Sequence, residues 1–508
     1  MTGVTLRRPG SHAGPKRFER ARGIMPHGVA WTSSAASPFV GSPYPLADPS
    51  VSSALRARAD EIESAFAAIE PTLRDLATRQ FADGFAEQAR AELNSRLGLD
   101  VPLEILAADW ATPLDVRRLY ARCVLGTFRR LIERAFDRGL AELSDGESAE
   151  TLIQRWGFHA IDISPCADGR LSGVVDYILR VPPSVVVSRR SYAGAMFDVA
   201  ETLRQWESVE LRRFREGMPN AADAPTRFLK IGVYHFSSAD PRHGGCAAHG
   251  SDDRRAAAAV LERLEQFAEA VRLTHCCDAE AAILLVGVDT DTDAIRVHVP
   301  DAYGRMTVDR AVDNRALYEQ TRDLTRDLTR DAAKDAIRDA VATCAGVALD
   351  DAQTEGIRWF CGYLLKNNLA QVDAVRAWHG GAYADRGHTE RLIVVGDSVD
   401  DVQLRNLAFQ AQMSTLEEGA ADLDVGVRIL RELHEPRGLG VPVFIHAVYD
   451  PRIPGARDVA EIRARRLGSA IRSRYADLAQ TGALELLAVV RANDGSTLAL
   501  AEQMGAIA

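Results

Sequence analysis

Three side chains that can take part in catalysis lie at alternate positions after one apolar run. In "AIDISPCADGR", Cys166 supplies a thiol, Asp168 a carboxylate and Arg170 a guanidinium. A cysteine thiolate is a metal ligand. The planar fork of an arginine can hold a neighbouring carboxylate in its ionised form, which a lysine does poorly. The spacing therefore indicates a metal site with a fixed acidic group beside the metal.

Two further candidate ligands follow downstream. His235 ends the apolar run "FLKIGVYHF", and Cys246 lies in the glycine-rich segment "HGGCAAHGS". Ligands of parallel α/β sheets collect at the carboxyl ends of the strands, so Cys166 and His235 face one crevice if their strands are neighbours. Two thiolates and one imidazole suit zinc, and three protein ligands leave a fourth position open, as in catalytic zinc sites. The sequence thus predicts a catalytic zinc site.

Each of these residues also has an ordinary structural explanation. A cysteine in a strand is most often a small core residue, and a histidine at a strand end usually only forms hydrogen bonds. The case for a site rests on the order of the candidates and on their positions at predicted strand ends.

Helical spacing dominates the region before these residues. Apolar residues recur three or four positions apart over 51–148, which predicts an α-helical N-terminal domain. Residues 1–50 carry six basic residues against two acidic ones in a context rich in Ser, Pro and Gly. We expect this segment to be a disordered basic tail.

From Trp156 onward, short β-rich runs alternate with helical stretches. Examples of the β-rich runs are "FHAIDIS", "VVDYILRVPPSVVVS", "FLKIGVYHF" and "AAILLVGVDT". This alternation predicts an α/β domain with a mainly parallel sheet over 149–390. The Arg and Asp pairs at helical spacing in 322–340 predict a solvated helix within it.

A second β-rich region over 391–508 resembles the first and predicts an internal duplication. It begins with "RLIVVGDSVDD" and continues through "VPVFIHAVYD". Aligning the two regions pairs Cys166 with Ser398, Asp168 with Asp400 and His235 with Asp450, so the second region lacks the thiol and the imidazole. We therefore expect a degenerate second copy without a metal site.

The composition is that of a soluble globular protein. The chain has 508 residues, of which 46% are hydrophobic and 26% are charged, and its net charge is −10. We expect no membrane insertion, because no apolar stretch approaches the roughly 20 residues that span a bilayer. General nucleic-acid binding is also not expected, because it requires an excess of basic residues. Seven cysteines without framework spacing favour a reducing cytosol.

Together, the "CADGR" segment, the strand ending in His235 and the Cys246 loop resemble the β-class carbonic anhydrases. The segment "VYHFSSADPRHGGCAAHGSDD", the helical N-terminal region and the second copy are most similar to the carboxysomal subclass. The resemblance covers about 51–508. It implies a β-carbonic-anhydrase-like fold in two copies that mimic the usual dimer, reversible hydration of CO2 to bicarbonate, and one zinc ion held by Cys166, His235 and Cys246. It also implies a catalytic dyad of Asp168 and Arg170.

The imidazole ligand has a second candidate. The common β-class pattern His-x-x-Cys-Gly would select His243, with Ala247 in place of the glycine. We expect His235 instead, because the histidine of the family lies at a strand end. His243 and His249 would then be loop residues, either able to transfer protons near neutral pH or without such a role.

The resemblance also implies a location and partners. The enzyme would convert bicarbonate to CO2 for Rubisco inside the carboxysome. The basic tail could dock on Rubisco or on shell proteins through multivalent contacts. A homodimer is the expected assembly, because two-fold symmetry is the commonest among soluble oligomers.

Two alternative functions remain open. The segments "ILLVGVDTDTD" and "LIVVGDSVDD" resemble strands of haloacid-dehalogenase-like phosphatases that bind Mg²⁺. That interpretation leaves Cys166, Asp168 and Arg170 unused, and we expect the acidic loop to be a solvent-facing turn. The other alternative is a non-enzymatic carboxysome scaffold protein, against which the open three-ligand site and the dyad argue.

Overall fold

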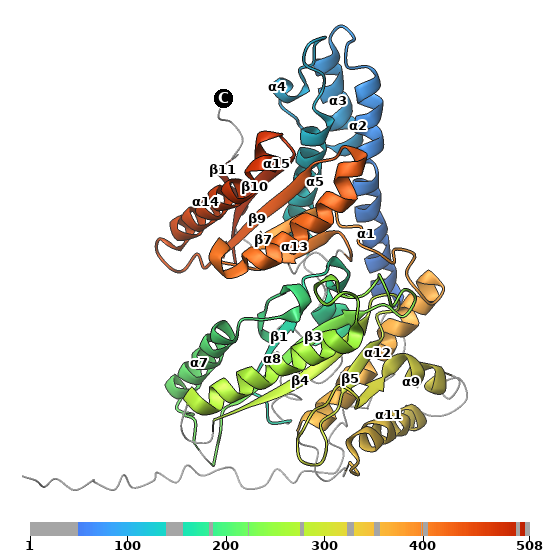
Figure 1. Ribbon diagram of the computed structural model, residues 1–508, viewed down its shortest axis with the longest axis vertical. Coiled ribbons are helices and arrows are strands. Elements are labelled where there is room, and N and C mark those ends of the chain that lie inside the picture. Colours follow the sequence, from blue (N-terminus) through green and yellow to red (C-terminus); the bar gives the residue numbers. More distant parts are fainter. Residues whose placement is uncertain are drawn as a thin grey trace, which may run out of the picture. The chain divides into compact units, whose positions relative to one another are not determined.

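The structure is a computed structural model that describes residues 49–138, 156–181, 186–221, 223–274, 279–322, 330–349, 356–397, 399, 405–493 and 498–502. The predicted basic tail falls almost entirely outside these ranges. The described part begins with helices and continues with two sheets, each accompanied by its own helices (Figure 1). Among the helices described, none combines the length and the hydropathy needed to span a membrane.

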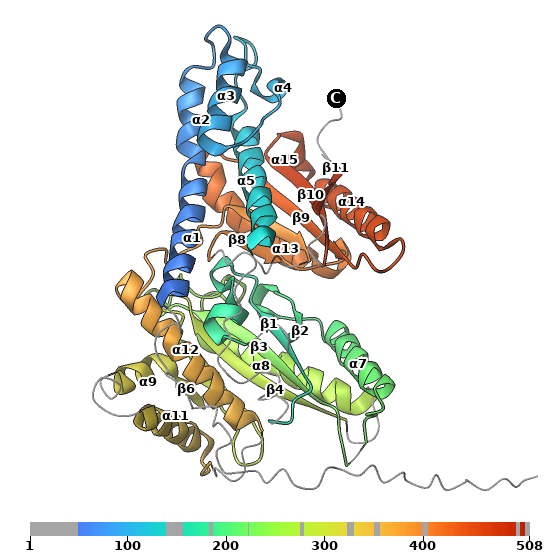
Figure 2. The ribbon, with the colours of Figure 1, turned by 180° about the vertical axis from the view of Figure 1, so that it is seen from behind.

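The N-terminal region is helical, as the apolar spacing predicts. Its helices are α1 (Pro49–Ala67), α2 (Ile69–Thr78), α3 (Phe85–Leu97), α4 (Leu103–Leu106) and α5 (Val116–Arg138). Helix α5 runs along the second sheet (Figure 2), and the rings of Phe128 and Phe444 have centroids 5.0 Å apart. A Cβ atom at Gly440 would lie 2.6 Å from the backbone oxygen of Arg117, so this close approach requires glycine.

The first sheet has six strands in the order β2-β1-β3-β4-β5-β6. The strands are β1 (Ala160–Pro165), β2 (Val186–Arg189), β3 (Arg227–Phe236), β4 (Glu280–Asp289), β5 (Ile295–His298) and β6 (Ala311–Asp313). The first four are parallel, while β5 and β6 are antiparallel. Strands β1 and β3 are buried on both faces, as expected for central strands of a parallel sheet.

The helices that accompany this sheet are α7 (Val199–Arg215), α8 (Asp253–Thr274), α9 (Asn314–Thr321), α11 (Arg330–Ala345) and α12 (Ile357–His379). Helix α8 lies across β3 and β4 (Figure 1). Of the solvated helix predicted at 322–340, the described residues 330–340 are helical and form most of α11.

One predicted β-rich run begins with a helical turn. Val174–Leu179 form a helical turn, and only β2 of the same run is extended. The buried side chains of this turn are spaced by one, three and four residues, which is a helical and not a strand period. Asn368 of α12 donates a hydrogen bond of 3.0 Å to the carbonyl oxygen of Ile178, so α12 packs against the turn.

The second sheet has the strand order β11-β10-β9-β7-β8. Its strands are β7 (Leu392–Gly396), β8 (Ala408–Ala411), β9 (Val441–Tyr449), β10 (Leu484–Ala492) and β11 (Leu498–Glu502), and its helices are α13 (Leu416–His434), α14 (Ala456–Arg474) and α15 (Ala476–Gln480). Strands β8, β7, β9 and β10 are parallel and β11 is antiparallel. The order and directions are those of β2, β1, β3, β4 and β5. The predicted α/β class with a helical N-terminal region is confirmed, with mixed sheets.

Alternating side chains of β7 belong to two different cores. Leu392 and Val394 pack with the N-terminal helices, whereas Ile393 and Val395 pack with α13 and α14. Successive strand residues point to opposite faces, so the N-terminal helices cover one face of the second sheet.

The sheet registers correct one predicted pairing between the two regions. The alignment matches Ile161 with Ile393, and these residues pair with Leu229 and Val443 in the neighbouring strands. Counting six residues along each strand matches His235 with Tyr449, not with Asp450. The prediction was wrong by one residue because similarity of short strands does not determine register. The predicted counterparts Ser398 and Asp400 lie outside the described residues.

Candidate metal centre

The two strands that carry the first candidate ligands are neighbours, which is the condition for the shared crevice. Strands β1 and β3 are parallel, and Pro165 pairs with Val233. Cys166 follows β1 directly, and its backbone N–H donates to the carbonyl oxygen of Val233 at 3.0 Å. His235 lies two residues further along β3. Both side chains therefore lie at the carboxyl edge of the sheet.

A tight loop after β3 brings Cys246 to the same edge. Ser237 begins the loop, and its hydroxyl donates to Asp291 at 2.8 Å. The loop then folds back so closely that a Cβ atom at Gly245 would lie 2.8 Å from the backbone oxygen of Ser251. A side chain does not fit there, which explains the glycine next to Cys246.

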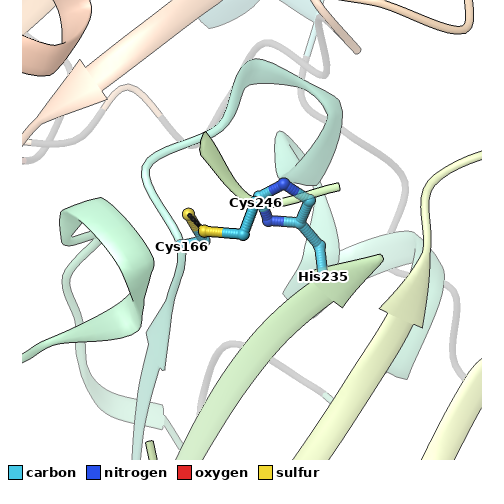
Figure 3. A group of neighbouring side chains, drawn as sticks. All are labelled: Cys166, His235 and Cys246. Carbon is cyan, nitrogen blue, oxygen red and sulfur yellow. Dashed lines mark hydrogen bonds between the residues drawn. The ribbon is translucent and has the colours of Figure 1, made fainter. Parts of the chain in front are cut away.

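Cys166, His235 and Cys246 converge (Figure 3). One donor atom from each lies within 4.8 Å of the others, and all three residues are buried. The two sulfur atoms are 3.8 Å apart. Sulfur atoms about 2.3 Å from one tetrahedral zinc ion would lie about 3.8 Å from each other. The donor set and its spacing therefore fit zinc.

Asp168 and Arg170 form a buried bidentate pair. The Nε atom of Arg170 donates to Oδ1 of Asp168 at 2.9 Å and the Nη2 atom donates to Oδ2 at 2.7 Å. Oδ1 also accepts the backbone N–H of Arg170 at 2.9 Å, because Asp168 caps the short turn Gly169–Leu171. The sequence prediction that these two side chains contact each other is confirmed.

The carboxylate also reaches the imidazole of His235. Its Oδ2 atom lies 3.1 Å from Nε2 of His235, while Nδ1 of His235 has no hydrogen-bond partner within the described part of the chain. Burial alone would raise the pKa of Asp168, but Arg170 and His235 outweigh it and hold that pKa well below its ordinary value. Asp168 is therefore ionised at any physiological pH.

The two thiols differ in their electrostatic surroundings. The hydrogen bond from Cys166 and the amides of Ala248 and His249 outweigh burial and lower the pKa of Cys246. The hydrogen bond to Cys246 and burial raise the pKa of Cys166. A single proton between the sulfurs has these opposite effects, so Cys246 ionises first.

A cavity of about 10 Å³ adjoins the three donors. That volume is about the size of one water molecule. The lining includes three apolar side chains from the second half of the chain, Phe409, Val425 and Ile429, together with His388. The open side of the donor set therefore faces a small space with an apolar wall.

Comparison with known proteins agrees with this geometry. Family models described as carboxysome shell carbonic anhydrase match the chain in three parts: the N-terminal model over 44–136, the catalytic-domain model over 148–388 and the C-terminal model over 389–504. A carboxysome shell carbonic anhydrase of Halothiobacillus neapolitanus is 43% identical over 453 residues, which cover 89% of this chain and 88% of that protein.

The chain belongs to the carboxysome shell carbonic anhydrase family. A family member from Parasynechococcus marenigrum is 42% identical over 94% of this chain and 82% of its own length. Another from Hydrogenovibrio crunogenus is 37% identical over 86% of this chain and 82% of its own length. The resemblance inferred from the residues is thereby confirmed.

The alternative histidines of this family member lie elsewhere. The side chain of His243 is 82% exposed, and its Nδ1 atom lies 3.2 Å from Asp240. His249 is buried, with Nε2 3.2 Å from the carbonyl oxygen of Gly194. Neither is among the residues that line the cavity. The structure therefore brings His235, and not His243, to the two cysteines.

Sequence reasoning missed His388 and the apolar wall. His388 lies in "HGGAYADRGH", which reads as a glycine-rich break between two regions. It is grouped in space with Asp168 and Glu390. The only local signal is a carboxylate two residues after a histidine, which is common in any chain.

The acidic segment "DTDTD" is buried, which corrects the prediction of a solvent-facing turn. Asp291 accepts the hydroxyl of Ser237 and the N–H of Ala239, each at 2.8 Å. Asp293 accepts the hydroxyl of Tyr383 at 2.7 Å. Asp291 therefore holds the loop that leads to Cys246, whereas Asp293 holds the segment that contains Tyr383.

Proposed function

We propose that this protein catalyses the reversible hydration of CO2 to bicarbonate inside the carboxysome, where it supplies CO2 to Rubisco. Family membership over most of the chain supports the activity and the location. The observation that carries the proposal is the convergence of three buried donor atoms beside a small cavity with an apolar wall.

Cys166, His235 and Cys246 would hold one zinc ion per chain. The separation of 3.8 Å between the two sulfurs supports this assignment, because it needs no rearrangement of the thiols. Bound zinc supplies the positive charge that lowers the pKa of a water molecule to near neutrality.

Asp168 and Arg170 would act as the catalytic dyad. The free-energy cost of burying the carboxylate is offset by the two hydrogen bonds from Arg170. An ionised Asp168 in this position can only accept a hydrogen bond from the attacking oxygen, which directs a lone pair of that oxygen at CO2. Arg170 keeps the carboxylate from rotating.

The apolar wall suits the substrate. CO2 has no hydrogen-bond donor and no net charge, so its transfer from water into an apolar space costs little free energy. The apolar wall of Phe409, Val425 and Ile429 would exclude water from the side of the cavity that binds CO2. The second half of the chain then completes a site that has its ligands in the first half.

The fold supports a site with its metal ligands in the first half of the chain and its apolar wall in the second half. The two sheets share strand order and direction, as expected for two copies of one β-carbonic-anhydrase-like domain. At the position of His235 the second copy has Tyr449, which lacks an imidazole. We infer that one metal site serves both halves, with domains at 51–148, 149–390 and 391–508.

We also propose that the protein forms a homodimer. The basic tail would dock on Rubisco or on shell proteins.

The test is zinc content and CO2 hydration rate on the wild type and on Cys166→Ala, His235→Ala and His243→Ala. We expect about one zinc ion per wild-type chain. Both zinc and activity should be lost in the first two variants and kept in His243→Ala, the matched control. Loss of zinc in His243→Ala alone would assign the ligand to that residue, and an active wild type without zinc would overturn the metal assignment.

A further inference from the structure

Two large aromatic side chains are exposed on loops of the N-terminal helical region. Phe81 follows α2 and is 65% exposed, and Trp110 follows α4 and is 92% exposed (Figure 1 labels both helices). A single exposed apolar residue is ordinary on a protein surface, whereas exposed aromatic residues that lie together are typical of interfaces. The loops that carry the two rings decide whether they form one surface.

Hydrogen bonds hold these two loops together. The side chain of Gln80, which precedes Phe81, accepts the backbone N–H of Leu114 at 2.7 Å. Leu114 lies at the end of the turn that carries Trp110, and within that turn the carboxylate of Asp109 accepts two backbone N–H groups at 2.8 and 2.6 Å. Both rings therefore stand on a fixed backbone, so their burial against a partner costs little conformational entropy.

The surroundings of the two rings are acidic. Segments 80–89 and 97–116 contain no lysine and no arginine. The exposed acidic residues of these segments are Asp83, Glu87, Asp100, Glu104, Asp109 and Asp115. Asp100 pairs with Arg90 at 2.7 Å, which neutralises only part of this charge. We call Phe81, Trp110 and these carboxylates the aromatic–acidic surface. It suits a partner with apolar and guanidinium groups, because a guanidinium both stacks on rings and pairs with carboxylates.

A second exposed surface lies at the end of α7. Leu211 and Phe214 are three residues apart on one face of that helix, and Phe214 is 64% exposed. Gly217 then adopts the left-handed conformation, and the N–H of the exposed Met218 donates to the carbonyl oxygen of Arg213 at 2.8 Å. This helix-ending motif keeps Met218 against the last turn. Three large apolar side chains are therefore exposed together.

The charge of this second surface is opposite to that of the first. Residues 211–218, "LRRFREGM", contain three arginines and one glutamate. Two of the arginines, Arg212 and Arg215, are exposed. We call Leu211, Phe214, Met218, Arg212 and Arg215 the apolar–basic surface. One chain thus presents two exposed apolar surfaces whose charges complement each other.

We propose that the aromatic–acidic surface of one copy of this chain binds the apolar–basic surface of a second copy. Phe214 packs against Phe81 and Trp110, and the two exposed arginines pair with the surrounding carboxylates. Burial of the rings provides affinity, and the charges fix the orientation. In a two-fold dimer the same contact forms twice, once from each copy. This contact specifies the interface of the proposed homodimer and does not depend on turnover.

The first experiment measures self-association of the full-length chain by sedimentation velocity. Trp110→Ser and Phe214→Ser should each raise the dissociation constant by about tenfold or more, because each removes a central aromatic contact. Tyr303→Ser removes another exposed aromatic residue and is the matched control, with an expected change of less than about twofold. A monomeric wild type, or equal dissociation constants in all three variants, would overturn the proposal.

A charge exchange tests whether these two surfaces contact each other. Asp83→Arg with Glu87→Arg reverses charge on one surface, and Arg212→Glu with Arg215→Glu reverses it on the other. At low salt each pair of substitutions should weaken association by about tenfold or more. A chain with all four should recover to within about threefold of the wild type, because opposite charges face each other again. Failure to recover would overturn the pairing.

Mixing the serine variants separates a lost contact from a misfolded chain. A pair formed by one Trp110→Ser copy and one Phe214→Ser copy keeps one intact contact, so the mixture should associate more tightly than either variant alone. Equal association in the mixture and in the single variants would contradict the proposal. CO2 hydration rates are measured on the same samples. A wild type that associates through this contact without hydrating CO2 would refute the proposed activity and leave the interface standing.

Discussion

At the scale of single residues, all three nitrogen atoms of the Arg170 guanidinium donate hydrogen bonds within the site. Two of its nitrogens hold Asp168, and the third donates to the carbonyl oxygen of Gly244 at 2.7 Å. The same nitrogen lies 3.3 Å from the hydroxyl of Thr290. This single side chain thus joins the dyad to the loop that leads to Cys246.

Arg170→Lys tests this arrangement while the charge is kept. A lysine offers a point charge in place of a planar fork, so Asp168 loses its bidentate partner and can rotate. We expect kcat to fall by about tenfold or more, with zinc content unchanged. Metal analysis and stopped-flow rates check the prediction. Activity within about twofold of the wild type would show that the fork is not needed.

At the scale of elements, the turn before β8 holds the dyad from the second half of the chain. The backbone N–H of Asn406 donates to the carbonyl oxygen of Gly169 at 2.7 Å. Arg405 donates to the carbonyl oxygens of Arg170 at 3.4 Å and Thr290 at 2.5 Å, and it lies over the ring of Tyr383. A Cβ atom at Gly169 would meet the backbone oxygen of Ala408 at 2.9 Å, so the two halves are in close contact here.

Arg405→Met should loosen the dyad without removing any catalytic group. The substitution leaves two buried carbonyl oxygens without this donor, which costs about 1–3 kcal/mol of the free energy of unfolding. We expect faster amide hydrogen exchange at 167–171 and a lower kcat. Arg457→Met on α14, where the arginine pairs with Glu461 at the surface, is the matched control. Equal exchange rates in both variants would contradict the prediction.

At the scale of the whole molecule, the second half of the chain contributes to the site through its contacts with the first half. Phe409, Val425 and Ile429 reach the cavity from β8 and α13. Gln412 accepts the backbone N–H of Ser191, and Asp422 accepts that of Ala193 at 3.0 Å. The second half therefore lines the cavity and holds backbone of the first half, although we propose no metal site in it.

The basic tail is proposed to act at this largest scale. Deleting residues 1–48 ends just before α1 and removes six basic residues. We expect unchanged turnover, because every residue that we assign to the site lies after residue 156. We also expect the variant to lose its co-assembly with carboxysomes. Encapsulation of wild type and deletion variant, compared in the same cells, checks this. Retained encapsulation would show that other surfaces direct assembly.

Patterns in the sequence were enough to predict the α/β class, the helical start, and a candidate site at Cys166, Asp168, Arg170, His235 and Cys246. These depend on short-range patterns: a strand end, a spacing of two residues, and a glycine-rich loop. The folded structure was needed to show that His235, and not His243, lies beside the two thiols, and that Tyr449, and not Asp450, matches His235. It also revealed His388 with Glu390 and the wall from the second half. The reason is physical. His388, Glu390 and the apolar wall reach the site from segments more than 200 positions after Cys166, and no local periodicity records which distant segments will meet.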